Sequence, residues 1–452
     1  MRRNLPVLVA KEFSGVDLGD RRLSKRCGKL AKGMALNPEK SLPKALEDWA
    51  QTKAAYRFLS NENVTREKLL KPHIAQTALR GKEQGVILTI QDTTYLNFSD
   101  HKATEGLGWI GRTEVLQGLV VHSTLAVGGE DREVLGLLHQ EVWAREEPMA
   151  KDEKSRDRRN RPRESERWVR GIAAVDRLSL KRHVIAIFDR EGDIYEALGE
   201  LDRTKQGFVI RAAWNRRLVG EAGHLFDAVR SAPELGTMEV HVPAKAGRAA
   251  RTAQLVLRSV LVSIKPPRGA EEKAAAIETA VVQAVELNPP AGIEALEWVL
   301  LTREAHQTLE ECIAVVRYYT ARWKIEEFHM GLKTGCRIEE RQLKTRAALE
   351  AFLGFCDVIA VMLLRLRDSA RRLEQRPASE ILSPIQLRLL SKKNRRLPAD
   401  PNAREALRAI AQLGGFLARK SDGEPGWRTL WCGMQKLLLM EQGYLLATTS
   451  GT

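Results

Sequence analysis

The sequence contains little cysteine, and none of it is spaced as a cross-link or a metal site. Its five cysteines are scattered, odd in number, and form no Cys-x-x-Cys pair. This argues against a disulfide framework and a structural zinc site, and it fits a reducing compartment. The N-terminus also lacks the long apolar run of a signal peptide. The most apolar long segment, residues 347–364, carries Glu350 and Asp357, so we expect a buried helix and no membrane partner.

Acidic residues are fewer than basic residues in the chain as a whole. The 452 residues include 73 Lys and Arg against 58 Asp and Glu, which gives a net charge of +15. Such a balance favours an anionic partner, nucleic acid first, although many cytosolic proteins share it. The length allows two or three domains, and no internal repeat or low-complexity tract is present. We therefore expect a soluble, cytoplasmic protein.

The most informative stretch is residues 308–333, which we interpret as one helix. Thr308 and Glu311 have the spacing of a capping box, and Gly335 stands where a C-cap glycine would end the helix. A set of apolar residues recurs at helical spacing along one face: Ala314, Ala321, Ile325, Phe328 and Leu332. This face is predicted to pack into a core.

A second face of the same helix combines four polar side chains. Tyr319, Arg322, Glu326 and Lys333 follow the spacing Tyr-x2-Arg-x3-Glu-x6-Lys and fall within about 60° of one another. A solvated face with i,i+4 ion pairs is the ordinary explanation for such a pattern. Spacing alone does not separate that explanation from a functional one.

Two further carboxylates follow apolar runs that we interpret as buried strands. Asp92 comes after residues 86–90, and Asp189 comes directly after residues 184–188. An aspartate in this position is most often a turn former. Together with Glu326, however, the two would make an oxygen-rich site suited to two Mg²⁺ or Mn²⁺ ions. Other predicted strands are residues 118–127, 134–143 and 208–213, with a helix at 168–177 and a β-rich insertion at 214–301.

Basic residues gather in the N-terminal segment. We predict helices over residues 17–34 and from Pro43 to about Leu59, separated by a proline-containing turn. The first of them carries the side chains that we consider for DNA contact: Arg21, Arg22, Lys25, Arg26 and Lys29. On charge alone, a DNA-binding unit and an ordinary solvated helical pair explain this segment equally well.

These motifs together resemble the insertion-sequence-four family of DDE transposases, and in particular its Tn5-type members. The resemblance lies in YTARWKIEEFHMGLKTG around Glu326, in DTTYLNFSD at Asp92 and in FDREGDIYE at Asp189. It extends to SLPKALEDWAQTKAAYRFLSN near the N-terminus and to LGGFLARKSDGEPGWRTLW near the C-terminus. It therefore covers nearly the whole chain.

The resemblance implies an α/β fold with an RNase H-like mixed-sheet core. It implies an N-terminal end-binding domain over residues 1–65, a catalytic domain over 66–370 and a helical dimerisation domain over 371–452. Asp92, Asp189 and Glu326 would be the catalytic metal ligands, and Tyr319, Arg322 and Lys333 would contact a DNA phosphate. Trp298 in LEWVLLT would stack on a base flipped out during hairpin formation. The implied partners are double-stranded DNA and a second copy of the chain, in the bacterial nucleoid.

Two alternatives are a non-catalytic DNA-binding inhibitor derived from a transposase and a two-metal nuclease that cuts without joining. The pattern Gly106-x-Gly108-x-x-Gly111 matches a dinucleotide fingerprint, but the strand–turn–helix context is missing. Three histidines without metal-ligand spacing are interpreted as structural or DNA-facing: His122, His139 and His329. Arg190 and Asp193 are considered as residues that could orient the metal site. The charged segment 145–170 is predicted to form a mobile loop leading into a helix.

Overall fold

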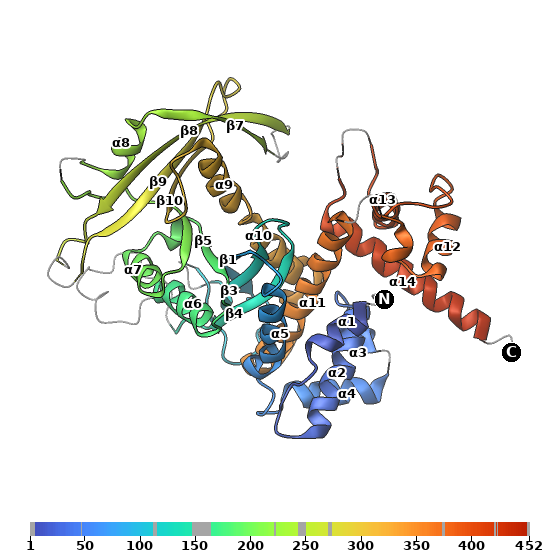
Figure 1. The fold of residues 1–452 in the computed structure, drawn as a ribbon. Coiled ribbons are helices and arrows are strands. Elements are labelled where there is room, and N and C mark those ends of the chain that lie inside the picture. Colours follow the sequence, from blue (N-terminus) through green and yellow to red (C-terminus); the bar gives the residue numbers. More distant parts are fainter. Residues whose placement is uncertain are drawn as a thin grey trace.

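A large mixed sheet extends over one side of the molecule, at the left of the view in Figure 1, and the N-terminal and C-terminal helical groups lie below it and to its right. The computed structural model describes residues 5–46, 48–111, 115–146, 164–220, 223–242, 250–269, 274–372, 376–419, 422 and 424–449. Most of the charged segment predicted as a loop, residues 147–163, lies outside the described residues. Its described end leads into α6 (Glu166–Arg177), which confirms the helix predicted there.

Five strands build the core of the sheet in the order β4-β3-β1-β5-β6. β1, β3 and β4 pair antiparallel, whereas β1, β5 and β6 run parallel. This confirms the predicted RNase H-like mixed α/β core. β5 and β6 are buried on both faces, by α6 and α7 (Tyr195–Thr204) on one face and by α9 (Leu309–Thr320) on the other. The core strands are β1 (Val86–Asn97), β3 (Gln117–Gly128), β4 (Val134–Trp143), β5 (His183–Phe188) and β6 (Gly207–Arg211).

The β-rich insertion continues this sheet. β10 pairs antiparallel with β6, and β9, β8 and β7 follow outward from it. The sequence did not predict β7, because this edge strand alternates with polar residues and carries no apolar run. A short two-residue strand, β2 (Gly108–Trp109), stands where the glycine motif was considered, which agrees with its rejection as a dinucleotide site. The insertion comprises α8 (Leu225–Arg230), β7 (Glu234–Val242), β8 (Arg251–Ile264), β9 (Ile277–Glu286) and β10 (Glu297–Thr302).

Among the described residues, the predicted N-terminal domain contains four helices rather than the two that we predicted, and α5 follows it and packs against β4 and α11 (Arg346–Arg372). The second predicted helix is divided, because Asp48 accepts a hydrogen bond from the backbone of Ala50 and starts a new helix. The turn between α2 and α3 is tied to the rest of the chain, since the buried guanidinium of Arg341 donates to the carbonyls of Pro38 and Lys40. The helices are α1 (Leu5–Glu12), α2 (Arg21–Leu36), α3 (Leu42–Leu46), α4 (Trp49–Leu59) and α5 (Arg66–Gly81).

The long apolar helix predicted in the second half of the chain is α11 (Arg346–Arg372), which packs against α5 and β4. Among the described residues it alone has the length and composition of a membrane span, but 83% of its apolar window is buried inside the protein. This confirms that it is a core helix.

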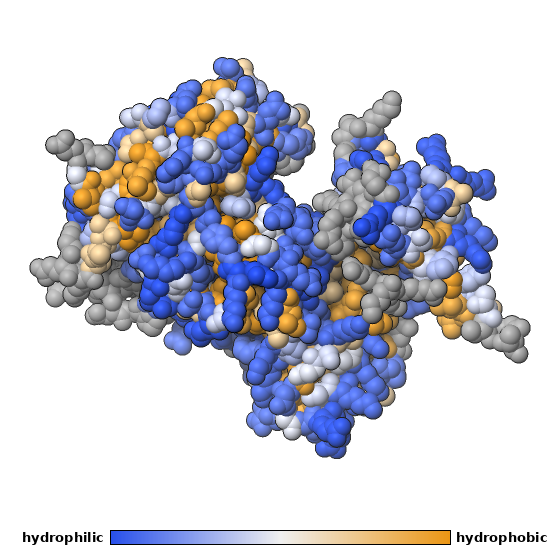
Figure 2. Space-filling model, in the orientation of Figure 1, coloured by the Kyte–Doolittle hydropathy of each residue, from blue (hydrophilic) through white to orange (hydrophobic). Residues whose placement is uncertain are grey.

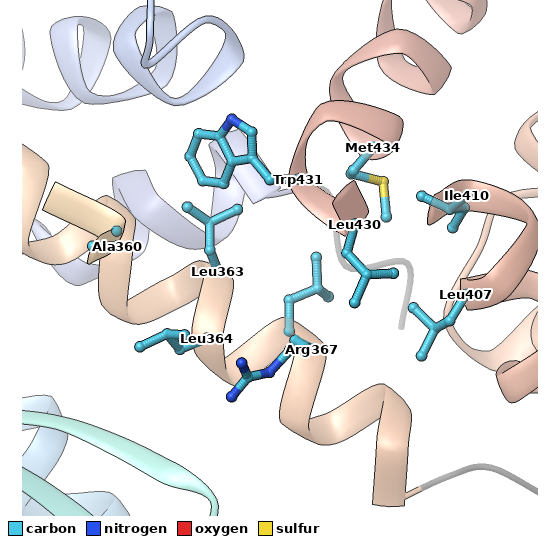
Figure 3. A pocket seen from close by; sticks show the side chains of 11 residues that line it. Ala360, Leu363, Leu364, Arg367, Leu407, Ile410, Leu430, Trp431 and Met434 are labelled. Atoms are coloured by element: carbon cyan, nitrogen blue, oxygen red, sulfur yellow. The ribbon is translucent and has the colours of Figure 1, made fainter. Parts of the chain in front are cut away.

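The C-terminal group follows α11 and contains three helices, α12 (Pro384–Lys393), α13 (Ala403–Leu413) and α14 (Trp427–Thr449). Residues 375–403 are rich in proline, serine and arginine, a composition that predicts a linker or irregular segment, and this prediction is wrong for α12. Pro384 begins this helix rather than breaking a structure, since a proline in the first turn loses no hydrogen bond there. Apolar side chains of α11, α13 and α14, including Leu363, Trp431 and Met434, face one another across a cavity of about 40 Å³ (Figure 3).

Candidate active site

Asp92 lies within β1 and not after it, which corrects the sequence-based expectation. The strand continues to Asn97, because the β-branched and aromatic residues beyond Asp92 pair in register with β3. On its other side β1 pairs with β5 through Ile90 and Ile187. Asp92 and Asp189 each lie two residues beyond this pair, so the two aspartates stand side by side. The Asp92 side chain is only 16% exposed.

Asp189 stands where it was predicted, directly after β5. Its carboxylate accepts a hydrogen bond of 2.9 Å from the backbone of Glu191 and caps the short 3₁₀ turn Arg190–Gly192. Asp193, in the same motif, does not face the metal site. It is buried and bonded to Arg216 and to the backbone of residues 213 and 214. Its role is to anchor a neighbouring loop.

The predicted single helix from Thr308 to Lys333 is three consecutive segments. The capping box of Thr308 and Glu311 is present and starts α9 (Leu309–Thr320), as expected. At Ala321 and Arg322 the hydrogen bonds tighten to an i,i+3 pattern, and α10 (Trp323–Met330) begins there. A π-type turn, Gly331–Gly335, carries Lys333. The polar face predicted for one continuous helix is therefore divided over three segments.

The third carboxylate, Glu326, projects from α10 and is 43% exposed. Its Oε1 atom is 2.8 Å from a guanidinium nitrogen of Arg322, one helical turn earlier. Arg322 also lies over the ring of Trp323 at 5.2 Å. The i,i+4 pair that is the ordinary explanation of this face is therefore present, and it places a cation directly beside the acidic group.

The three acidic residues lie within electrostatic reach of one another. Burial first, and then the charges of Asp189 and Glu326, raise the pKa of Asp92 to about 7, whereas the hydrogen bond from the Thr93 backbone and the charge of Arg322 oppose the rise. A buried carboxyl group facing two like charges fits a site for a divalent cation. Within the described ranges, however, no three His, Cys, Asp or Glu side chains already surround one point as metal ligands.

His329 lies next to this acidic group, and no pattern in the sequence marked that position. Its Nδ1 atom is 3.8 Å from Asp92, and burial together with Lys333 and Arg322 lowers its pKa to about 3. The imidazole is therefore neutral. The other two histidines are elsewhere: His122 is buried between Gln91 and Thr93, as a structural residue, and His139 bonds Glu141.

Tyr319 and Trp298 pack together at the end of α9. Their rings meet edge to face at 5.7 Å, and each side chain is more than nine-tenths buried. Burial raises the pKa of Tyr319, with Arg211 and Arg322 as the nearest cations. A hollow of about 820 Å³ opens beside Trp298, between β7 and the helices α9 and α10, and Glu326 lies at its edge. The same hollow is therefore lined by Trp298 of β10 and by Glu326 of α10.

The basic N-terminal side chains lie on α2, far along the chain from these carboxylates. All five predicted residues, from Arg21 to Lys29, are exposed, while Cys27 and Leu30 face the core of this group. Hydrophilic residues cover much of this lobe, at the bottom of the view in Figure 2. An exposed row of cations on one helix face is a surface that fits DNA phosphates.

Family comparisons match both ends of the chain. Residues 8–64 match the family model for transposase DNA-binding, and residues 358–450 match that for the transposase Tn5 dimerisation domain. The two ends of the chain are therefore similar to the DNA-binding and the dimerisation domains of transposases.

Both matches are to transposase domains, and the second is to the Tn5 type, in agreement with the resemblance of the sequence motifs. A solved structure, the piggyBac transposase synaptic complex with hairpin DNA, is also similar. It has a TM-score of 0.39 and 11% identity over 82% of this chain and 76% of that one. A likeness at this level carries no argument about the site.

Proposed function

We propose that this protein is a cut-and-paste DNA transposase that acts on the inverted repeats at the ends of a transposon. It would cleave through a hairpin intermediate and join the freed 3′ ends to target DNA. The observation that carries the proposal is the convergence of Asp92, Asp189 and Glu326 from two adjacent strands and a helix. Transposase domains for DNA binding and dimerisation flank that site in the chain.

Asp92, Asp189 and Glu326 are the residues that would hold two Mg²⁺ or Mn²⁺ ions. Hard cations prefer carboxylate oxygens, and a cation would relieve the repulsion that the buried Asp92 now meets. When bound, such ions supply activation of a water or hydroxyl nucleophile and stabilise the departing oxygen. Because Glu326 is 43% exposed, it can turn from Arg322 toward the aspartates at little cost in packing.

The neighbouring side chains would position the DNA. Arg322 stays charged beside Glu326 and can pair with a phosphate oxygen when the carboxylate turns away. Lys333, on the turn after α10, adds a second cation near His329. Tyr319 can donate its hydroxyl, with its ring held in place by Trp298. These residues would orient the scissile phosphate toward the carboxylates.

Trp298 would receive the base that leaves the stack during hairpin formation. Its ring forms part of the wall of the hollow beside Glu326, which gives an unstacked base a place next to the reacting phosphate. The ring is 9% exposed, so it also packs against Tyr319 as a core residue. We therefore expect its replacement to affect hairpin formation more than the first nick.

A time course on labelled end DNA with Mg²⁺ tests these assignments. Asp92→Asn, Asp189→Asn and Glu326→Gln should each reduce nicking by roughly a thousandfold or more, because each removes a ligand charge. Binding of end DNA, measured by gel shift, should change little. Trp298→Ala should leave the nick nearly normal and slow the hairpin step by roughly ten- to a hundredfold.

The same assay separates the alternatives. A non-catalytic inhibitor would bind end DNA and never nick it, and a nuclease would nick without forming hairpins or joined products. A variant of the acidic group that nicks at the wild-type rate would refute the catalytic assignment. Charge reversal at Arg21, Arg22 and Lys25 should weaken binding and reduce its salt dependence, if α2 is the end-binding surface.

A further inference from the structure

A second surface for DNA lies on the other side of strand β10 from Trp298. Side chains alternate along a strand, so Glu297 and Val299 face away from the hollow beside Trp298. They line a separate hollow of about 620 Å³. Arginines from four different parts of the chain contribute to its wall: Arg190, Arg211, Arg230 and Arg251. A polar hollow with this many guanidinium groups suits phosphate oxygens.

This hollow begins at the catalytic edge of the sheet. Arg190 directly follows Asp189, and Arg211 ends the neighbouring strand β6. Arg190 is exposed and makes no ion pair with a described residue, whereas Arg230 and Arg251 are paired with glutamates. The arginine next to the second catalytic aspartate is therefore available for a phosphate.

An exposed aromatic side chain follows this hollow in the chain. Trp214 comes two residues after Ala212, which lines the hollow, and is 64% exposed. The loop that carries it is held firmly. Asp193, fully buried, accepts hydrogen bonds from the backbone nitrogens of Ala213 and Trp214 at 2.7 and 3.2 Å and pairs with Arg216.

The other side of the loop is fixed as well, because Asn215 accepts a hydrogen bond of 2.8 Å from the backbone of Phe226 at the start of α8. Phe226 itself lines the arginine hollow. An indole ring exposed on an anchored loop, whose neighbours Ala212 and Phe226 line the arginine hollow, supplies the two elements that bind a DNA strand: a stacking surface and a charged groove.

We propose that Trp214 and Arg190, with the adjoining arginine-lined hollow, bind the DNA that lies beyond the scissile phosphate and outside the transposon. This rests on the proposed function, in which the hollow beside Trp298 takes the transposon side of the cut. DNA on the opposite side is then the donor flank before cleavage or the target DNA afterwards. Both are duplex strands with the same phosphate and base chemistry.

Binding is tested first in an Asp92→Asn background, so that no cleavage is needed. The affinity of the Asp92→Asn protein is measured for end DNA with a flanking duplex and for precut DNA, which stops at the transposon terminus. Trp214→Ala should weaken binding of the flanked DNA by about fivefold or more and leave the precut DNA unaffected. Trp214→Phe should retain most of the affinity, whereas Trp214→Leu, which keeps the apolar bulk, should not.

A second arm follows joining of precut ends to target DNA by the active protein. Weaker binding of flanked DNA in the first arm assigns the surface to the donor flank. Slower joining to target DNA in the second arm assigns it to the target. Unchanged results in both arms overturn the proposal, as does equal weakening on flanked and precut DNA or full rescue by Trp214→Leu. Leu261→Ala, another exposed apolar side chain on β8, is the matched control. A wild-type protein that never nicks would refute the proposed function and leave the binding arm intact.

Discussion

Two buried carboxylates in this molecule have opposite surroundings. Glu12, at the end of α1, is enclosed by His73 and Arg80 of α5. Burial would raise its pKa, but the hydrogen bonds and charges around it lower the pKa to about 2. Asp92 is buried to a similar degree, and its pKa is raised to about 7 by burial and by Asp189. One carboxylate is neutralised from within the protein and the other is not.

This difference separates a structural carboxylate, Glu12, from one whose charge is not compensated within the protein, Asp92. The Glu12 group is complete: His73 donates from Nδ1 to Glu12 at 2.5 Å and accepts from the backbone of Leu137 at Nε2. Burial lowers the pKa of His73, so the imidazole is neutral and Arg80 supplies the positive charge. Asp92 has other carboxylates as neighbours, an arrangement that costs stability unless a cation from outside joins it.

The largest effect on stability is expected from Glu12→Gln. The change leaves the partly buried Arg80 without its anion and should reduce the free energy of unfolding by roughly 3 kcal/mol. The variant also tests the direction in which the fold shifts the pKa of Glu12. The pKa in the folded protein is below the ordinary value of 4.5, so the contribution is present above pH 4.5 and is lost as the pH falls toward 2.

Urea unfolding of both proteins at pH 7 and pH 3.5 measures this. The gap between wild type and Glu12→Gln should be full at pH 7 and clearly smaller at pH 3.5. Asp92→Asn, measured without metal, is the comparison variant and should not lose stability. A Glu12→Gln protein as stable as wild type at pH 7 would mean that the internal pair does not stabilise the fold.

A smaller effect is expected from Mg²⁺ on thermal unfolding. An ion that binds only the folded state at ten times its dissociation constant adds about 1.4 kcal/mol of stability. The wild-type Tm should therefore rise with Mg²⁺, and the rise should disappear in Asp92→Asn. Glu12→Gln should keep the full rise despite its lower starting Tm, because its acidic site is intact. Equal shifts in all three proteins would place the ion elsewhere.

Most of the sheet could be predicted from the sequence, because its core strands are continuous apolar runs. What could not be predicted depends on contacts between distant segments. Asp92 was placed at a strand end because the apolar run stops there, yet pairing with β3 extends the strand. The break at Arg322 has no proline or glycine to mark it. His329 adjoins Asp92 only because α10 packs beside β1.

The catalytic assignment shows the same limit. Spacing alone allowed a solvated face for Arg322 and Glu326, and the i,i+4 ion pair of that explanation is indeed present. Motif resemblance, and not periodicity, selected the three carboxylates. The parallel register of β1 and β5 then explains why two aspartates nearly a hundred residues apart stand next to each other.

The smallest effect is expected at a third buried carboxyl group, Asp357 of α11, which lies between the other two cases. It is fully buried, and burial raises its pKa to about 7, although a hydrogen bond of 2.9 Å from Gln140 opposes the rise. Its second oxygen has no hydrogen-bond partner, as fits a protonated group. At pH 6 the side chain is therefore largely neutral, and an amide has nearly the same shape. Near pH 3.5, where the carboxyl group is protonated in the unfolded protein as well, Asp357→Asn should change the free energy of unfolding by less than about 1 kcal/mol.

The pH dependence of this variant completes the comparison. The pKa of Asp357 in the folded protein is above its ordinary value of 3.8, so wild type loses stability as the pH rises from about 4 to 7. An amide side chain cannot titrate, so the Asp357→Asn protein should not lose this stability. Its free energy of unfolding should therefore rise relative to that of wild type between pH 5 and pH 8. Parallel urea titrations at these two values measure the gain. If wild type instead gains on the variant as the pH rises, Asp357 is held as a charged group, like Glu12, and Arg66 would be the cation that compensates it.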